Sequence, residues 1–227
     1  MKRIIISIIF ISILGLCENT FALIKSQNLI FGSRLEGNAY NYVGNTTGTV
    51  TGAVTSTGSA GAGYYFDGTD DYIQYGRLTQ LEGTTTEYTI CISVKLTEIT
   101  QNHEIFAYDQ NASLGGEDIY LFWHSTGVLL LETGSSAEKN TNITSLSDGA
   151  WHRIAFVKTS TNILVYDNGV LRYNVAKNGG TFGSNFSFYF GFVAITWRGS
   201  LDEVLIYSRA LTAAEVRQDM LLLAPGE

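Results

Sequence analysis

Short alternations of apolar and polar residues, separated by turn-forming residues, make up most of this chain. In Tyr88–Leu96 every second side chain from Tyr88 onward is apolar. Successive side chains of a β-strand point to opposite faces of its sheet, so this run predicts a strand with a buried face. The other predicted strands are Leu29–Phe31, Gly63–Phe66, Tyr72–Tyr75, His103–Tyr108, Ile119–His124, Val128–Glu132, Trp151–Lys158, Ile163–Asp167, Val170–Val175, Ser187–Phe192 and Leu201–Tyr207. Many short strands with frequent turn signals predict an all-β sandwich or barrel.

Turn and capping residues indicate how these strands are connected. Asp167-Asn168-Gly169 predicts a tight hairpin turn, because Asn and Gly tolerate positive φ angles. The segment Asn41–Gly63 is rich in Gly, Thr, Ser and Ala, and we interpret it as loops and edge strands of one domain rather than as a linker. Thr212-Ala-Ala-Glu215 is a capping-box pattern, followed by apolar residues at helical spacing. We therefore expect a short C-terminal helix packed on the sandwich.

The N-terminus has the layout of a secretory signal peptide. A basic start precedes the mostly apolar residues 4–16, and the small residue Ala22 follows a polar stretch. Signal peptidase recognises this order, so we predict that residues 1–22 are removed and that 23–227 form one domain. The apolar run is too short to cross a bilayer as a helix, and the residue before Cys17 disfavours a lipoprotein anchor. We expect a secreted protein, extracellular or periplasmic, without membrane insertion.

The net charge limits the classes of partner, and the cysteine content limits the disulfides that can form. The formal net charge is −7, and signal removal makes it one unit more negative. An acidic chain without a basic cluster repels phosphate groups, which argues against nucleic acid and anionic lipid as partners. Cys91 would be the one cysteine left, so no disulfide can form within the mature chain. Its position inside a predicted strand indicates a packed side chain rather than a reactive thiol.

Five segments of the chain resemble a known family when they are taken in order. They are Tyr65-Phe-Asp-Gly-Thr-Asp-Asp-Tyr-Ile73, Tyr88-Thr-Ile-Cys-Ile-Ser-Val-Lys95, Asp148-Gly-Ala-Trp-His-Arg-Ile-Ala-Phe-Val157, Tyr166-Asp-Asn-Gly169 and Arg198-Gly-Ser-Leu-Asp-Glu-Val-Leu-Ile-Tyr-Ser-Arg-Ala-Leu211. Together they resemble a laminin-G-like domain of the concanavalin A-like lectin/glucanase superfamily, from about Leu29 to Met220. The resemblance implies a jelly-roll β-sandwich of two antiparallel sheets, often with bound calcium. It also implies binding of glycans, proteins or lipids.

The carboxylates that glycosidases of this superfamily need are not recognisable in the sequence. Retaining enzymes place two carboxylates close together, and laminarinase-like members carry them as Glu-x-Asp-x-x-Glu along one strand. Here the nearest acidic pairs, Glu117-Asp118 and Asp202-Glu203, are adjacent residues that point to opposite faces of a strand. The Arg-rich and Gln-x-His strands of alginate-lyase-like jelly rolls are missing, as are paired-histidine zinc motifs. The sequence therefore predicts a protein that is not an enzyme.

A structural calcium ion is the one cofactor that the sequence suggests. Asp202 alternates with Val204 in its predicted strand, so it shares a face with apolar side chains. A carboxylate on an inward face needs a cation or several hydrogen bonds. Asp67 and Asp71 could join Asp202 as oxygen ligands of calcium, if the sheet brings them together. The alternative, which we prefer, is that Asp202 accepts backbone N–H bonds and the other aspartates form an ordinary turn.

Sugar-binding residues are expected among aromatic and polar side chains near loops. A sugar site needs an aromatic face for the apolar side of the ring and polar groups for its hydroxyls. The candidates are Trp123, His124, Tyr108, Asn111 and Trp197. For each of them the alternative is an aromatic or polar residue of the core or its rim.

These observations favour a secreted, non-catalytic, carbohydrate-binding module of lectin type. The alternative is a structural or adhesive, protein-binding component of a cell surface or virion, which should self-associate or co-purify in a larger particle. The partner is then a glycan in the first case and an extracellular protein in the second.

Overall fold

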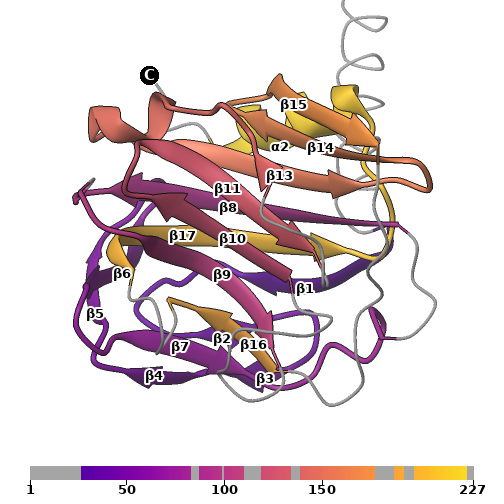
Figure 1. Cartoon of the computed structure of the whole chain (residues 1–227). Coiled ribbons are helices and arrows are strands. Elements are labelled where there is room, and N and C mark those ends of the chain that lie inside the picture. Colours follow the sequence, from indigo (N-terminus) through magenta and orange to yellow (C-terminus); the bar gives the residue numbers. More distant parts are fainter. Residues whose placement is uncertain are drawn as a thin grey trace, which may run out of the picture.

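The fold is a sandwich of two antiparallel β-sheets, as predicted (Figure 1). The computed structural model describes residues 27–82, 87–98, 100–109, 119–133, 139–176, 187–191 and 197–223. The predicted signal peptide lies outside these residues. Within them, no helix is both long and apolar enough to cross a bilayer.

The larger sheet has the strand order β15-β14-β13-β8-β17-β6-β5, and β1 also pairs with β17. Its strands are β1 Leu29–Ser33, β5 Val54–Thr57, β6 Ala62–Asp67, β8 Tyr88–Leu96, β13 His152–Lys158, β14 Asn162–Asp167, β15 Val170–Ala176 and β17 Arg198–Tyr207. The β14–β15 turn has positive φ angles of 48° at Asn168 and 73° at Gly169, which confirms the predicted tight hairpin turn.

The second sheet has the order β12-β11-β10-β9-β16-β7-β4. Its strands are β4 Thr49–Thr51, β7 Tyr72–Tyr75, β9 His103–Asp109, β10 Ile119–His124, β11 Val128–Thr133, β12 Lys139–Asn140 and β16 Ser187–Phe190. A separate hairpin joins β2 (Tyr40–Asn41) to β3 (Thr46–Thr47), and a 3₁₀ turn, η1, covers Ser145–Asp148. The segment between 41 and 63 thus contains loops and edge strands, as predicted.

The main core fills the space between the two sheets. Alternate residues of β8, such as Ile90 and Val94, meet Phe106 of β9 and Phe188 of β16 in one apolar cluster. Cys91 points to the opposite face of β8 and is fully buried there, which confirms its predicted packing role. Both faces of β8 are therefore covered, whereas its alternating sequence predicted only one.

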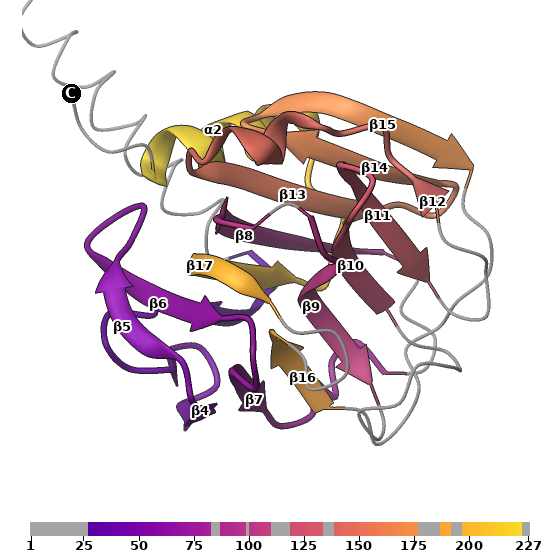
Figure 2. The same cartoon turned by 60° about the vertical axis from the view of Figure 1, so that its left-hand side comes forward.

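Helix α2, Ala213–Leu223, explains the second buried face. It lies on the outside of the larger sheet, away from the second sheet (Figure 2), and its Val216 packs in the same cluster as Cys91. The helix begins with the predicted capping box: the Thr212 N–H donates to Glu215 Oε2 at 2.7 Å, and the Glu215 N–H donates to Thr212 Oγ1 at 3.3 Å.

Candidate functional site

The predicted sugar platform is buried in this structure. Trp123, Tyr108 and Trp197 are each 0% exposed and belong to the main core. A ring without an exposed face cannot stack on a sugar, so the structure corrects the prediction for these three residues. His124 is half-buried at the end of β10, where its Nδ1 lies 2.7 Å from Thr126 Oγ1. Asn111 lies outside the described residues.

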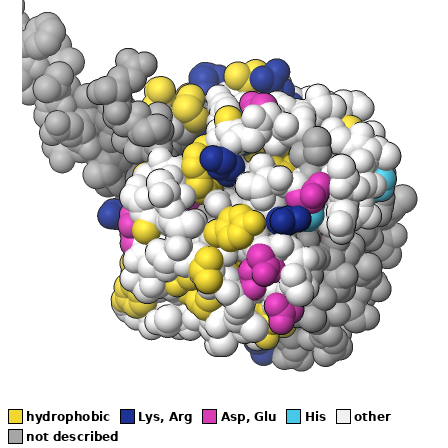
Figure 3. Space-filling view, turned by 90° about the vertical axis from the view of Figure 1, so that its left-hand side faces the viewer, with side chains coloured by type: hydrophobic (Ala, Val, Ile, Leu, Met, Phe, Trp, Pro, Cys, Tyr) yellow, Lys and Arg dark blue, Asp and Glu magenta, His cyan; other side chains and the backbone are white. Residues whose placement is uncertain are grey.

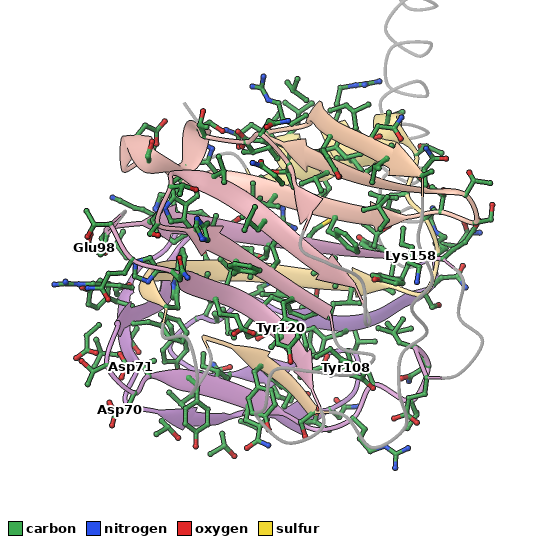
Figure 4. The ribbon with its side chains drawn as sticks, viewed as in Figure 1. Asp70, Asp71, Glu98, Tyr108, Tyr120 and Lys158 are labelled. Atoms are coloured by element: carbon green, nitrogen blue, oxygen red, sulfur yellow. The ribbon has the colours of Figure 1, made fainter. Side chains whose placement is uncertain are left out.

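The three predicted calcium ligands do not form one group. In the register of the sheet, Arg198 of β17 lies opposite Asp67 of β6. Asp202 lies further along β17, near the other end of β6. At about 3.3 Å per residue, the two aspartates are roughly 13 Å apart along the sheet. Asp70 and Asp71 lie at the edge of the molecule, as Figure 4 shows. Among the described residues, no group of three His, Cys, Asp or Glu side chains could hold a metal ion.

Hydrogen bonds satisfy Asp202, which is 0% exposed. Its Oδ2 accepts the backbone N–H groups of Ser59 (2.8 Å) and Ala60 (3.0 Å) and the Ser59 hydroxyl (2.9 Å). Its Oδ1 accepts the N–H of Glu203 at 2.9 Å. Burial raises the pKa of this carboxyl, and these donors work against that rise. Both oxygens of this carboxylate thus accept hydrogen bonds from N–H and O–H groups, which balance its negative charge. Asp202 therefore does not fit the role of a calcium ligand.

The second aspartate group is a hydrogen-bonded turn. Asp71 Oδ2 accepts the Asp67 N–H at 2.6 Å, and Asp67 Oδ1 accepts the Thr69 N–H at 2.8 Å. The latter bond, from a side chain to the backbone two residues on, is an Asx turn. Both aspartates therefore organise the connection between β6 and β7.

His152 sits in a buried polar network that stabilises the fold. Its Nδ1 lies 2.8 Å from Asp167 Oδ1, and its Nε2 lies 3.0 Å from Asp148 Oδ1. Ser145 donates to the other oxygen of Asp167. Ser145 thus bonds the aspartate, and both ring nitrogens of His152 contact carboxylates. In a nucleophilic triad the serine hydroxyl contacts the histidine, whereas here it contacts the aspartate. The three bonds together link η1 to β13 and β14.

An open hollow on the surface combines aromatic and polar side chains. It has a volume of about 320 Å³ and is lined by Arg34, Glu36, Asn38, Tyr40 and Tyr42. Tyr40 and Tyr42 are 41% and 42% exposed, unlike the buried aromatic residues of the sheets. Figure 3 shows the side of the molecule that carries the β5–β6 hairpin, where hydrophobic side chains lie beside acidic and basic ones.

Bends in the chain after β1 bring the described lining residues together. Residues 34, 36, 38, 40 and 42 line the hollow, and the chain bends at 36–38, with positive φ angles of 55° at Leu35 and 69° at Gly37. Leu35 points the other way and is buried in the core, so it anchors the segment that follows β1. A bent segment has no strand period, so the sequence contains no periodic signal for this site, and we did not predict it.

The two tyrosine rings are held in place by neighbouring residues. Tyr42 lies directly over Gly32, where a Cβ atom would overlap its ring, so only glycine allows this contact. The Tyr40 hydroxyl donates to Asn45 Oδ1 at 2.7 Å. Asn41, between them, accepts the N–H groups of Gly32, Val43 and Gly44 on its Oδ1, at 3.1 to 3.2 Å. These bonds connect the β2–β3 hairpin, which carries both tyrosines, to β1.

The polar groups of the hollow have defined roles. Asn38 Oδ1 accepts the Tyr40 N–H at 3.1 Å, and Glu36 Oε2 accepts the Ala62 N–H of β6 at 2.9 Å. Burial first, and then the charge of Glu203, raise the pKa of Tyr42, so its hydroxyl stays protonated near neutral pH. Exposed rings beside amide, carboxylate and guanidinium groups suit a ligand with an apolar face and several hydroxyls.

Comparison with known protein families gives a match over most of this fold. A family model described as the concanavalin A-like lectin/glucanases superfamily, of laminin-G type, matches residues 67–217. No curated protein sequence matches the chain.

Solved structures share the fold at low sequence identity. Domain 4 of AbnA, an extracellular GH43 arabinanase from Geobacillus stearothermophilus in complex with arabinotriose, aligns with a TM-score of 0.70 and 22% identity, over 87% of this chain and 98% of that one. The binding domain of Paraclostridial mosquitocidal protein 1 aligns with a TM-score of 0.68 and 19% identity, over 87% and 52%. Trypanosoma rangeli sialidase aligns with a TM-score of 0.65 and 14% identity, over 92% and 38%.

Proposed function

Because the chain belongs to the concanavalin A-like lectin/glucanases superfamily, we propose that it is a secreted, non-catalytic module that binds carbohydrate in the hollow. The observation that carries the proposal is the pair of exposed rings, Tyr40 and Tyr42, fixed beside Arg34, Glu36 and Asn38. The volume of about 320 Å³ is at the lower end for ligand pockets and suits one or two sugar rings. The arabinotriose complex of the arabinanase domain supports a sugar as ligand on this fold.

A non-catalytic role is supported by the chemistry of the hollow. Among the described residues that line it, only Glu36 carries a carboxylate, whereas glycosidases use a pair. One oxygen of Glu36 already accepts the Ala62 N–H. We therefore expect bound oligosaccharides to be recovered intact after long incubation with the protein, which chromatography of the sugar measures. Release of shorter products would contradict this part of the proposal.

A glycan array followed by calorimetry tests the site itself. Tyr40→Ala should weaken binding of any array hit by roughly ten-fold, because it removes an exposed stacking face and leaves the core intact. Leu171→Ala is the matched control, because Leu171 is 45% exposed but lies on β15, outside the hollow. Equal affinity of the Tyr40→Ala variant and the unmodified protein would show that sugars bind elsewhere.

Protein binding is the second candidate function, and strand β15 favours it. This strand is an edge of the larger sheet and exposes Val170 (50%) and Leu171 (45%). An edge strand offers unpaired backbone groups to which another strand can add. Light scattering of the purified protein distinguishes the two candidate functions. A structural component should form a larger particle, and a carbohydrate-binding module should stay small without its ligand.

A further inference from the structure

If the proposed function holds, the charged side chains of the hollow indicate which class of sugar the hollow binds. Arg34 and Glu36 line the same hollow two residues apart, yet they do not pair. Glu36 Oε2 bonds the Ala62 N–H, and its Oε1 lies against Gly61. The carboxylate is therefore turned toward the β5–β6 turn.

Arg34 is left with its charge available. Within the part of the chain that the structure describes, it has no ion-pair or hydrogen-bond partner, and its side chain is exposed. Glu203 and Asp219, which raise the pKa of the neighbouring Tyr42 after burial itself, are only 7% and 4% exposed. Asp219 already pairs with the buried Arg153 at 2.8 Å. Among the described residues, no carboxylate therefore forms an ion pair with Arg34.

We infer that the ligand is an acidic sugar whose carboxylate pairs with Arg34 while its ring stacks on an exposed tyrosine. The planar guanidinium donates two parallel hydrogen bonds that match the two oxygens of a carboxylate. A sugar seated on Tyr40 or Tyr42 also shields this pair from water, which strengthens the attraction. Uronic acids and sialic acids both present such a carboxylate beside a ring with hydroxyls.

Titration calorimetry with paired ligands tests the charge separately from the ring. The first pair is trigalacturonic acid and its methyl ester, and the second is sialyllactose and its methyl ester, so the members of each pair differ only in the charge of the carboxylates. In at least one pair the acid should bind roughly ten- to a hundred-fold more tightly, with the advantage shrinking as salt is added. The pair that shows the difference identifies the source of the carboxylate. A neutral member that binds as tightly as its acid in both pairs overturns the inference.

Two arginine variants assign the effect to the hollow. Arg34→Gln keeps a planar hydrogen-bonding group and removes the charge, so it should abolish the preference for the acid over its neutral ester. Arg172→Gln removes an exposed charge from β15, at the edge of the larger sheet, and should leave the affinities for both members of each pair unchanged. Preference retained in Arg34→Gln overturns the inference and leaves the proposed function standing. Absence of any sugar binding by the unmodified protein removes the proposed function itself.

Discussion

Asp202 shows how a buried charge is held in this protein. Three backbone N–H groups and one hydroxyl, from Ser59, Ala60 and Glu203, surround its carboxylate. The bulge of β17 between Asp202 and Leu205, with a positive φ of 46° at Glu203, supplies one of these donors. A cation is not needed to balance a carboxylate that is bonded in this way.

Removing this carboxylate should cost stability. Asp202→Ala leaves several buried donors without an acceptor, so we expect the free energy of unfolding to fall by about 3 kcal/mol. Denaturant unfolding measures it, with Asp70→Ala as the control, because Asp70 is an exposed turn residue. Comparing calcium with a chelator completes the test: a loss for Asp202→Ala that occurs only in calcium would identify Asp202 as a metal ligand after all.

The network around His152 should make stability depend on pH. Burial lowers the pKa of His152, but hydrogen bonds to Asp167 and Asp148 outweigh it and raise the pKa above 6.5. For Asp167, burial raises the pKa, but the bonds from His152 and Ser145 bring it below 3.8. The histidine's contribution is complete below its unfolded pKa and is lost as pH rises through its folded pKa. The aspartate's contribution is complete above its unfolded pKa and is lost as pH falls through its folded pKa.

We therefore expect the network to stabilise the fold most between pH 3.8 and 6.5. The measurement is denaturant unfolding at a series of pH values for the unmodified protein and for His152→Gln. The difference between the two should be largest in this window and should shrink on raising the pH. A difference that grows from pH 6 to pH 9 would mean that His152 is buried as a neutral ring.

At the scale of elements, the contact between β1 and the β2–β3 hairpin positions the site. Gly32→Ala should displace the Tyr42 ring, since a Cβ atom there would overlap it. The ring is at the far end of a flexible side chain, so we expect only a small loss of stability but roughly ten-fold weaker sugar binding. Gly76→Ala is the control, because a Cβ atom there meets nothing within 4 Å. Equal affinities of both variants would show that the position of Tyr42 does not matter.

At the scale of the whole molecule, export remains a prediction. If the full chain is expressed with a secretory pathway, we expect the released protein to begin at Leu23, because Ala22 ends the signal pattern. Mass spectrometry of the intact protein measures this. A product that retains the first 22 residues, or one that carries lipid on Cys17, would contradict the predicted cleavage.

Much of the architecture followed from the sequence alone. Period-two alternation predicted strands such as β8 and β13, Asn168-Gly169 predicted a hairpin turn, and the Thr212–Glu215 pattern predicted the cap of α2. These features are local: strand periodicity, positive φ and capping bonds involve residues close together in the chain. Local patterns could therefore specify the elements and the sandwich class without any knowledge of the contacts between them.

The binding surface depended on tertiary structure. Trp123 and Trp197 carry the aromatic rings that a sugar platform needs, but both are buried in the core between the two sheets. Which face is inward depends on long-range pairing, such as that of β17 with β8. The hollow arises in the same way: the packing of Tyr42 on Gly32 and the bond from Ala62 to Glu36 join segments that the sequence separates. Exposure is a property of the assembled molecule, so only the fold could distinguish core rings from binding rings.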